Sequence, residues 1–264
     1  MREELGIEID GRGVARLVLN RIDKHNALSE DLIAALHAAA ERLGADPAVR
    51  VVVLTGNGAS FCAGGDLAWM QAQIAADGPT RAAAARRLAA MLGALNTMPR
   101  PLIGRVQGQA FGGGMGLISV CDVAVGVNTA RFALTETRLG LIPATIGPYV
   151  AARLGEAAAR RVFLSGRRFD AGEAVAMGLL ARAVPESELD AATEAEVAPF
   201  LACAPDAVAR AKAQLRALGP RIDEAVIEDS IARLVAAWES NEAAEGIAAF
   251  FERRKPRWAV GEAG

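Results

Sequence analysis

The sequence predicts an α/β fold that ends in an all-helical segment, and three observations support this prediction. Short apolar segments with strand character alternate with helical patterns as far as Val184. Two loops rich in small residues, at 58–67 and 107–114, each join a predicted strand to a predicted helix. No strand pattern follows Glu186, and this order of elements is typical of an α/β core followed by helices that cover it.

Strand patterns occur in six places. The first two segments alternate apolar and polar side chains around a Gly-Arg-Gly turn, which indicates a hairpin. The third is apolar throughout, as expected for a strand covered on both faces. Phe132 and Ala133 are expected to continue the sheet after the fifth strand. The predicted strands are 7–9, 14–19, 49–55, 103–106, 123–127 and 180–184.

Several helical patterns begin or end at residues suited to capping. Ser29 and Asp66 each precede a helical pattern with a side chain that can accept a hydrogen bond from a free N–H. Gly178 is placed to end a helix. A further helix follows the glycine run and extends to about Val120. Later helices are predicted at 148–154, 156–164, 171–177, 189–202, 206–218, 222–239 and 242–253.

Composition excludes several classes of function. Hydrophobic residues make up 52% of the chain, charged residues 23%, and the net charge is -2. This balance is ordinary for a water-soluble domain and offers no basic surface for nucleic acid or an anionic membrane. The start lacks the apolar segment of a signal peptide, and no stretch is apolar enough to span a bilayer. We therefore expect a cytoplasmic protein.

Cysteine and histidine offer little to a metal site or a hydrolase triad. Cys62, Cys121 and Cys203 stand far apart, so buried thiols are expected rather than disulfides or metal ligands. His25 and His37 have no cluster of further ligands at suitable spacing. We expect no metal.

The glycine loop in the stretch Ile103 to Asp122 is a candidate for binding a negatively charged oxygen. No Gly-Lys pair occurs, so there is no P-loop, and Leu117 stands where a dinucleotide fingerprint needs its third glycine. Two interpretations remain open: close packing of helix on sheet, or an oxyanion site that uses main-chain N–H groups. The similar loop before Asp66 can supply a second N–H to the same point.

Glu136 and Lys24 are polar residues with two possible roles each. Glu136 is the only acid between Asp122 and Glu156, and it has apolar neighbours in Leu134, Leu139, Leu141 and Ile142. It can pair with Arg138 or Arg131 on the surface, or it can lie buried with a raised pKa and transfer protons. Lys24, in the polar turn, can be solvated surface or a ligand contact.

Taken together and in order, the motifs of the chain resemble those of the enoyl-CoA hydratase/isomerase, or crotonase, superfamily. The resemblance covers almost the whole chain. The motifs are NRIDKHNAL, FCAGGDL, VQGQAFGGGMGL with the following CD, FALTETRLGLIP, SGRRFDAGEAVAMGLLARAVP and EGIAAFFERRKPRW.

The resemblance implies a fold, an assembly and a chemistry. The fold would be a crotonase-like ββα spiral core at 1–188 that binds acyl-CoA, with a C-terminal helical segment at 189–264 that forms oligomers and covers the active site. The assembly would be a homotrimer or a dimer of trimers. The substrate would be an acyl-CoA thioester held in an oxyanion hole formed by the N–H groups of Ala63 and Gly113, with Glu136 as the catalytic acid and base.

The resemblance also implies binding residues, with coenzyme A as part of the substrate and no separate cofactor. The coenzyme A part would be bound by Lys24, Ala27, Cys62, Ala63, Gly65, Asp66, Leu67 and Lys255. The acyl part would lie against Trp69, Met70, Phe111, Gly112, Gly116, Leu139 and Pro143.

The chain departs from simple hydratases of this family at one catalytic position. They carry two glutamates, and Gly116 stands where the first would be, so that only Glu136 remains. The loop PATIGPYV and the segment DLAWM resemble the methylglutaconyl-CoA hydratase-like branch, which suggests a branched substrate with a distal carboxylate. Arg100, Arg105, Arg131 and Arg138 are conceivable partners for that carboxylate, although ordinary surface charge is the more common role of such arginines.

Two other functions remain open at this point. A single glutamate can also carry a proton from carbon to carbon, which would make the protein an enoyl-CoA isomerase. A protein of this fold can also bind acyl-CoA without catalysis. Glu136 argues against the second alternative, because a simple binding protein does not need a buried acid beside an oxyanion hole.

Overall fold

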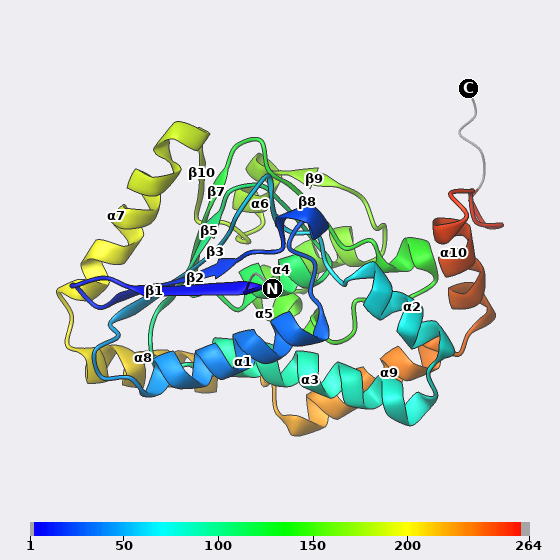
Figure 1. Cartoon of the computed structure of the whole chain (residues 1–264), viewed down its shortest axis with the longest axis horizontal. Coiled ribbons are helices and arrows are strands. Elements are labelled where there is room, and N and C mark those ends of the chain that lie inside the picture. The colour runs from blue at the N-terminus through cyan, green and yellow to red at the C-terminus, as the bar shows by residue number, and fades with distance from the viewer. Residues whose placement is uncertain (1–2, 260–264) are drawn as a thin grey trace.

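The computed structural model describes residues 3–259, which form two β-sheets surrounded by helices (Figure 1). The larger sheet has six strands in the order β1-β2-β3-β5-β7-β10. β1 and β2 are the predicted antiparallel hairpin, and the other neighbours are parallel. The strands are β1 (Leu5–Ile9), β2 (Val14–Leu19), β3 (Val51–Gly56), β5 (Leu102–Val106), β7 (Val123–Val127) and β10 (Arg182–Val184).

A smaller sheet lies beyond the carboxyl ends of the central strands. It consists of β4 (Ser60–Cys62), β6 (Gln109–Phe111), β8 (Arg131–Ala133) and β9 (Phe169–Asp170), in that order. The prediction that Phe132 and Ala133 continue the first sheet was therefore wrong. The chain turns after Val127, where Ala130 N–H donates to its carbonyl, and β8 pairs with β6 instead.

Strand, short strand and helix follow one another three times, which gives the ββα spiral that the family resemblance implied. The first two turns are β3, β4 and the helices after them, then β5, β6 and α4; β7, β8 and α5 form the third. The helices of the core are α1 (Glu30–Ala45), α2 (Leu67–Ala75), α3 (Gly78–Thr97), α4 (Gly113–Ser119), α5 (Gly147–Phe163) and α6 (Ala171–Ala176). Three short 3₁₀ turns are η1 (Ile22–Lys24), η2 (Glu136–Leu139) and η3 (Glu186–Glu188).

Local signals in the sequence set several helix ends. The side chains of Ser29 and Asp66 cap α1 and α2 as predicted, by accepting hydrogen bonds from main-chain N–H groups. The two helices predicted at 148–154 and 156–164 are the two halves of α5, because Gly155 breaks it with φ 71° and ψ 159°. Gly178 follows α6 with φ 79°.

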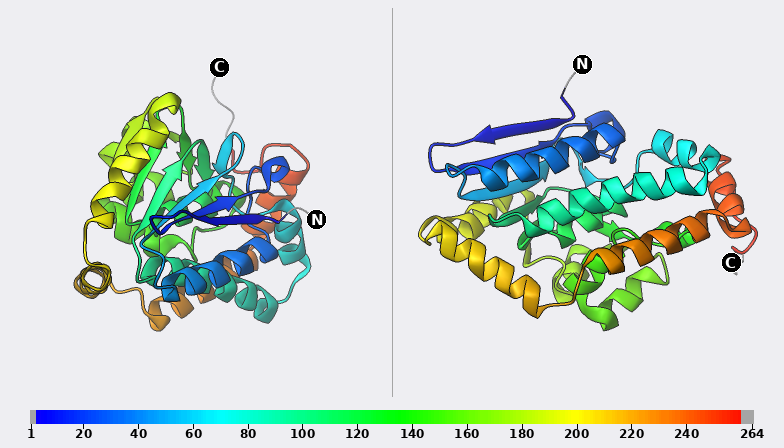
Figure 2. Two further views of the ribbon diagram at one scale, coloured as in Figure 1. Left: turned by 60° about the vertical axis from the view of Figure 1, so that its left-hand side comes forward. Right: turned by 90° about the horizontal axis from the view of Figure 1, so that it is seen from below.

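The C-terminal helices cover the core at opposite ends. They are α7 (Leu189–Leu201), α8 (Pro205–Leu218), α9 (Glu224–Trp238) and α10 (Asn241–Phe251). α7 lies against one face of the larger sheet, where Val197 packs with Val51 and Val53. α10 lies at the other end of the molecule, and α9 runs beside α3 (Figures 1 and 2).

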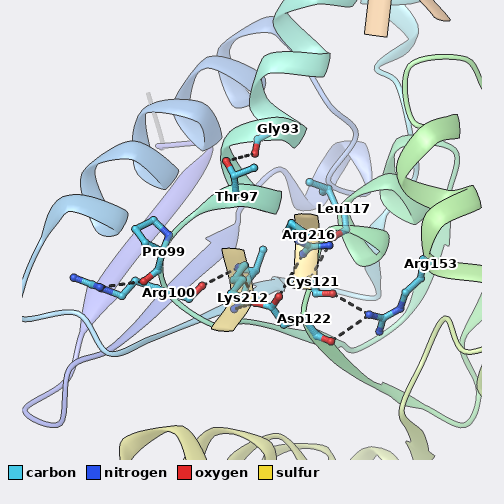
Figure 3. Close-up of polar contacts among 11 residues, drawn as sticks. Gly93, Thr97, Pro99, Arg100, Leu117, Cys121, Asp122, Arg153, Lys212 and Arg216 are labelled. Carbon is cyan, nitrogen blue, oxygen red and sulfur yellow. Dashed lines mark hydrogen bonds and ion pairs between the residues drawn. The ribbon is translucent and has the colours of Figure 1, made fainter. Parts of the chain in front are cut away.

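An ionic cluster around Asp122 joins α8 to the core (Figure 3). Lys212 Nζ lies 2.7 Å from Asp122 Oδ2 and donates to the carbonyl of Arg100 as well. Arg216 Nη2 lies 3.4 Å from the other oxygen of Asp122. Leu102 N–H also donates to this carboxylate, at 2.8 Å. Burial lowers the pKa of Lys212, and Asp122 opposes this shift.

Candidate active site

The two loops of small residues meet main chain to main chain. A Cβ atom on Gly114 would lie 2.3 Å from the carbonyl oxygen of Cys62, and one on Gly113 would lie 3.8 Å from the carbonyl carbon of Gly64. Gly112 has φ 47° and ψ -113°, and Gly64 has φ 97°, which are conformations that side chains disfavour. Glycine is therefore needed here for two reasons: it lets the two main chains come close together, and it allows the backbone conformations of Gly64 and Gly112.

The structure corrects one of the two predicted oxyanion donors. Ala63 N–H donates to the carbonyl of His25 at 3.0 Å, so it is already engaged. The main chain of Leu28 forms hydrogen bonds with both neighbours of Gly65. Leu28 N–H donates to the carbonyl of Gly64, and Asp66 N–H donates to the carbonyl of Leu28. This pairing turns the N–H of Gly65 itself away from Leu28.

Gly65 and Gly113 therefore each present an available main-chain N–H group at this point. Among residues 3–259, neither N–H has a hydrogen-bond acceptor. Gly113 is the first residue of α4, where the N–H groups have no partner within the helix and the helix dipole favours negative charge. The peptide unit that contains the Gly65 N–H adjoins Gly113. The pair of N–H groups can hold one anionic oxygen.

Glu136 brings a carboxyl group to the same two loops. It is the first residue of η2, and a Cβ atom on Gly112 would lie 3.0 Å from Glu136 Oε1 and 3.8 Å from the Cα of Gly64. Glu136 Oε2 is out of contact with solvent and has no hydrogen-bond partner among the described residues. Burial raises the pKa of Glu136 to about 7, which agrees with the predicted direction.

The position of the missing first glutamate is filled by a neighbouring side chain. Gly116 is buried in α4, and a Cβ atom there would lie 2.6 Å from Ile146 Cγ2. Ile146 belongs to the PATIGPYV loop and is 3% exposed. The loop and the glycine therefore fit one another, and a second acid at 116 has no room.

A buried ion pair ties the polar turn to the first glycine loop. Arg21 Nη2 lies 2.9 Å from Asp66 Oδ2, and Arg21 Nε lies 2.8 Å from Glu4 Oε1. The other oxygen of Asp66 caps α2, so this carboxylate is committed within the protein. Asn26, fully buried, donates to the carbonyl of Ser60 at 2.8 Å. Sequence reasoning missed Arg21, although its place before a polar turn is visible.

The other predicted binding residues are distributed over surface and interior. Cys62 is fully buried, and burial raises the pKa of its thiol to about 12, so its side chain cannot reach a ligand. Trp69 lies next to the loop, 3.5 Å from a Cβ atom on Gly65. Met70 and Phe111 are half-buried beside the same loops. Lys24, Leu67 and Lys255 are exposed, Leu139 is half-buried, and Ala27 and Pro143 are buried.

Of the four arginines considered as partners for a distal carboxylate, three are engaged elsewhere. Arg100 donates to the carbonyls of Pro99 and Asp46, Arg105 pairs with Asp190, and Arg131 donates to main-chain carbonyls. Arg138, two residues after Glu136, is exposed and has no carboxylate partner among residues 3–259. The surface pairs considered for Glu136, with Arg138 or Arg131, do not form in the described residues.

The described residues contain no group of three or more His, Cys, Asp or Glu side chains able to hold a metal ion. None of the helices between residues 3 and 259 is both long and apolar enough to cross a bilayer.

Comparisons with known proteins agree with the fold. The family model for enoyl-CoA hydratase/isomerase matches residues 10–261. Mevalonyl-coenzyme A hydratase sidH of Aspergillus fumigatus is 33% identical over 251 residues, covering 92% of this chain and 90% of that protein. Enoyl-CoA hydratase ACTT6 of Alternaria alternata is 36% identical over 205 residues, covering 77% and 67%.

Solved structures superpose over nearly the full chain. An enoyl-CoA hydratase from Mycobacterium avium has a TM-score of 0.85 at 34% identity and covers 98% of this chain and 100% of its own. An enoyl-CoA hydratase from Shewanella pealeana has a TM-score of 0.79 at 38% identity, with 97% and 96% covered. With its spiral of ββα turns and its paired glycine loops, this chain belongs to the enoyl-CoA hydratase/isomerase family.

Proposed function

We propose that this protein is an enoyl-CoA hydratase that uses Glu136 as its single acid and base and the N–H groups of Gly65 and Gly113 as its oxyanion hole. The observation that carries the proposal is the buried carboxyl of Glu136, which has a pKa of about 7 and lies against the loop of Gly112. Two free N–H groups on adjoining peptide units support it further. A desolvated acid beside such donors is suited to proton transfer at a thioester.

The reaction divides between these groups. The two N–H groups would hold the thioester oxygen, which becomes negative when the conjugated double bond is attacked, and each is worth about 2.7 to 4 kcal/mol. The ionised carboxylate of Glu136 would take a proton from water while the water oxygen bonds to Cβ. The protonated acid would then return a proton to Cα, which restores the carboxylate and neutralises the enolate.

One acid can serve both steps because of its pKa. With a pKa of about 7, Glu136 is present in both protonation states near neutral pH. A carboxylate with an ordinary pKa would be a weaker base and would take the proton from water less readily in the first step. The fit of Ile146 against Gly116 supports a one-acid mechanism for this chain.

We infer a substrate with a distal carboxylate from the position of Arg138. This arginine shares η2 with Glu136 and has no carboxylate partner in the described residues. A guanidinium can bind a carboxylate through two parallel hydrogen bonds. The acyl group would extend from the glycine loops towards η2, past the half-buried Leu139 and Phe111.

An enoyl-CoA isomerase is the second candidate, because a single acid also suffices to move one proton between two carbons. The two functions differ in the substrate that reacts. A hydratase removes the conjugated absorbance of a 2-enoyl-CoA, whereas an isomerase creates that absorbance from a 3-enoyl-CoA. Incubating the purified protein with each ester separately tests the proposal, and loss of absorbance from the 2-enoyl ester is expected. Binding of acyl-CoA without turnover of either ester would instead indicate a non-catalytic binding protein.

The substrate class is tested with a variant of Arg138. We expect Arg138→Gln to raise KM about tenfold for a 2-enoyl-CoA with a distal carboxylate and to leave a simple 2-enoyl-CoA unaffected. Arg131→Gln is the matched control, since Arg131 is exposed but donates to main-chain carbonyls. An unchanged KM for the distal-carboxylate substrate in Arg138→Gln, relative to the unmodified protein, would contradict the assignment. Mevalonyl-CoA, after the name of the Aspergillus relative, belongs in the panel for the reverse reaction.

The proposal includes coenzyme A as the carrier part of the substrate, with Lys24 and Lys255 as candidate contacts to its phosphates. It also includes assembly as a homotrimer or a dimer of trimers, which light scattering of the purified protein measures directly.

A further inference from the structure

Helix α10 touches the turn η2 through two glycines. A Cβ atom on Gly246, inside α10, would lie 2.4 Å from both C and O of Leu139. A Cβ atom on Gly140, at the end of η2, would lie 2.4 Å from both C and O of Glu242. Cβ atoms do not approach main-chain atoms this closely. The main chains of α10 and η2 are therefore in direct contact, and each contact depends on a glycine.

The contact fixes the backbone of Glu136 as well as that of its neighbours. Gly140 ends η2 with φ 70°, and its N–H donates to the carbonyl of Thr137 at 3.3 Å. Leu141 N–H donates to the carbonyl of Glu136 itself at 3.0 Å. The turn that carries the catalytic carboxyl is thus closed by the segment 139–141, which α10 holds.

Apolar packing holds α10 against η2, and ionic contacts fix the end of the helix. Leu141 is buried against Trp238, Ala243 and Ile247, with the half-buried Leu139 beside them. Glu245 of α10 accepts from Arg254 at 2.6 Å and from Arg257 N–H at 2.9 Å, which ties the end of the helix to the chain that follows. The helix cannot shift along η2 without losing the apolar contacts of Leu141.

We propose that α10 positions Glu136, so that Gly246 and Gly140 are positioning residues for the catalytic acid; this inference rests on the proposed function. The acid needs both burial and correct aim, and a displacement of about 1 Å can cost up to 100-fold in rate. The C-terminal helix is in this view part of the catalytic apparatus.

The substitution Gly246→Ala tests the proposal, with Gly93→Ala as its matched control. Both glycines lie inside helices, but a Cβ atom on Gly93 meets only Tyr149 Oη at 3.5 Å, which is ordinary contact. Alanine favours a helix more than glycine does, so propensity alone would benefit both variants. We expect kcat of Gly246→Ala to fall about 10- to 100-fold with KM for the acyl-CoA little changed, and Gly93→Ala to match the unmodified protein.

Two further readouts separate positioning from general stability. The pH dependence of kcat/KM should shift to lower pH in Gly246→Ala, because a displaced Glu136 gains contact with water. The charged groups on the two elements are Arg138, Glu242 and Glu245; Glu245 is paired with Arg254, and the other two are exposed. Hydrogen exchange at Leu141 N–H should accelerate in Gly246→Ala and stay unchanged in Gly93→Ala.

The outcomes distinguish this inference from the proposed function. If the unmodified protein hydrates no 2-enoyl-CoA, the proposed function fails, while the exchange at Leu141 still decides whether α10 holds the turn. If the protein is active and Gly246→Ala keeps its kcat, pH profile and exchange, the inference is overturned. Should Gly246→Ala fail to fold, Ile247→Val loosens the same contact without a clash, and the same three readouts then decide, with a two- to threefold loss of kcat expected.

Discussion

Asp122 and Glu136 are two carboxylates of one spiral core with opposite surroundings. Asp122 receives hydrogen bonds from Leu102 N–H and Lys212 and lies near Arg216. Glu136 lies against glycine loops with one oxygen buried and unpartnered in the described residues. Neither residue is fully exposed, so the difference lies in the hydrogen-bond donors that surround each carboxylate.

The comparison contrasts an acid that holds two parts of the fold together with the acid proposed to be catalytic. A carboxylate that accepts hydrogen bonds from several donors is committed to contacts within the protein. A carboxylate that is buried without donors has its pKa raised, which is costly for folding and useful for proton transfer. The ionised carboxylate of Glu136 therefore destabilises the folded protein, whereas that of Asp122 stabilises it. Substitutions at the two positions should have opposite effects on the free energy of unfolding.

The largest expected effect is the loss of activity in Glu136→Gln. Glutamine keeps the shape of the side chain but cannot accept and return a proton, so turnover should fall about 100- to 10,000-fold. The kcat for hydration of a 2-enoyl-CoA measures this. Near-normal turnover of Glu136→Gln would show that Glu136 is not the catalytic acid and base, and the proposed difference in role from Asp122 would then be wrong.

The second prediction concerns Asp122→Ala. Removing this carboxylate leaves Lys212 buried without its partner, which should cost about 3 kcal/mol of unfolding free energy. Denaturant unfolding measures the loss, and the activity of the folded fraction should be unchanged. Asp229→Ala is the control, because the exposed i,i+4 pair of Asp229 with Arg233 should contribute less than about 0.5 kcal/mol. Equal losses in the two variants would show that the Asp122 cluster does not hold α8.

The third prediction is a gain of stability in Glu136→Gln above neutral pH. Burial raises the pKa of Glu136 from 4.5 to about 7. The cost of ionising it in the folded protein therefore builds up as the pH rises from 4.5 to about 7 and is constant above that. At about 1.4 kcal/mol per pKa unit, the full cost is about 3 kcal/mol and is reached above about pH 8. Unfolding of Glu136→Gln and the unmodified protein should differ by up to this amount at about pH 8.5 and be similar near pH 4.5. A lower unfolding free energy for Glu136→Gln than for the unmodified protein at high pH would mean that hydrogen-bond donors or cations stabilise the ionised carboxylate.

A smaller effect is expected from Gly116→Ala. The added methyl group would meet Ile146 Cγ2 at 2.6 Å in a packed interior, which should cost about 2 kcal/mol. Gly116→Ala combined with Ile146→Val should recover part of this loss, as followed by thermal unfolding. If the double variant is no more stable than the sum of its single changes, the two residues do not limit one another.

The smallest effect is the dependence of rate on pH. Hydration begins with the ionised form of Glu136, so kcat/KM should rise about tenfold per pH unit below 7 and level off above it. Initial rates between about pH 5.5 and 8.5 measure this. A profile that levels off near pH 4.5 would indicate a solvated carboxyl, closer in behaviour to a surface acid than to a buried one.

Local chemistry made much of the fold predictable from the sequence. The caps at Ser29 and Asp66, the hairpin and the break between the two halves of α5 depend on neighbours within a few residues. The family resemblance gave the spiral, and the apolar neighbours of Glu136 gave the direction of its pKa shift. The short strands of the second sheet were missed, because a three-residue strand has too few positions to show alternation.

Long-range contacts decided the features that the sequence left open. The N–H of Gly65, and not that of Ala63, is free because Leu28 pairs with the loop. That pairing joins segments far apart in the chain, so the local sequence does not reveal it. The contact of Gly246 with η2 and the fit of Ile146 against Gly116 are likewise invisible locally. Cys62 illustrates the same limit. Its motif suggested a binding residue, but its thiol is fully buried and cannot contact a ligand.

The packing of Ile146 on Gly116 also constrains how such a protein can change over time. A mutation that introduces glutamate at 116 meets an occupied space, so its effect depends on whether 146 has already become smaller. The order of mutations then matters, because a path that begins at 116 passes through a less stable form. A neighbouring branched side chain can in this way keep an enzyme on one chemical route after the alternative residue has been lost.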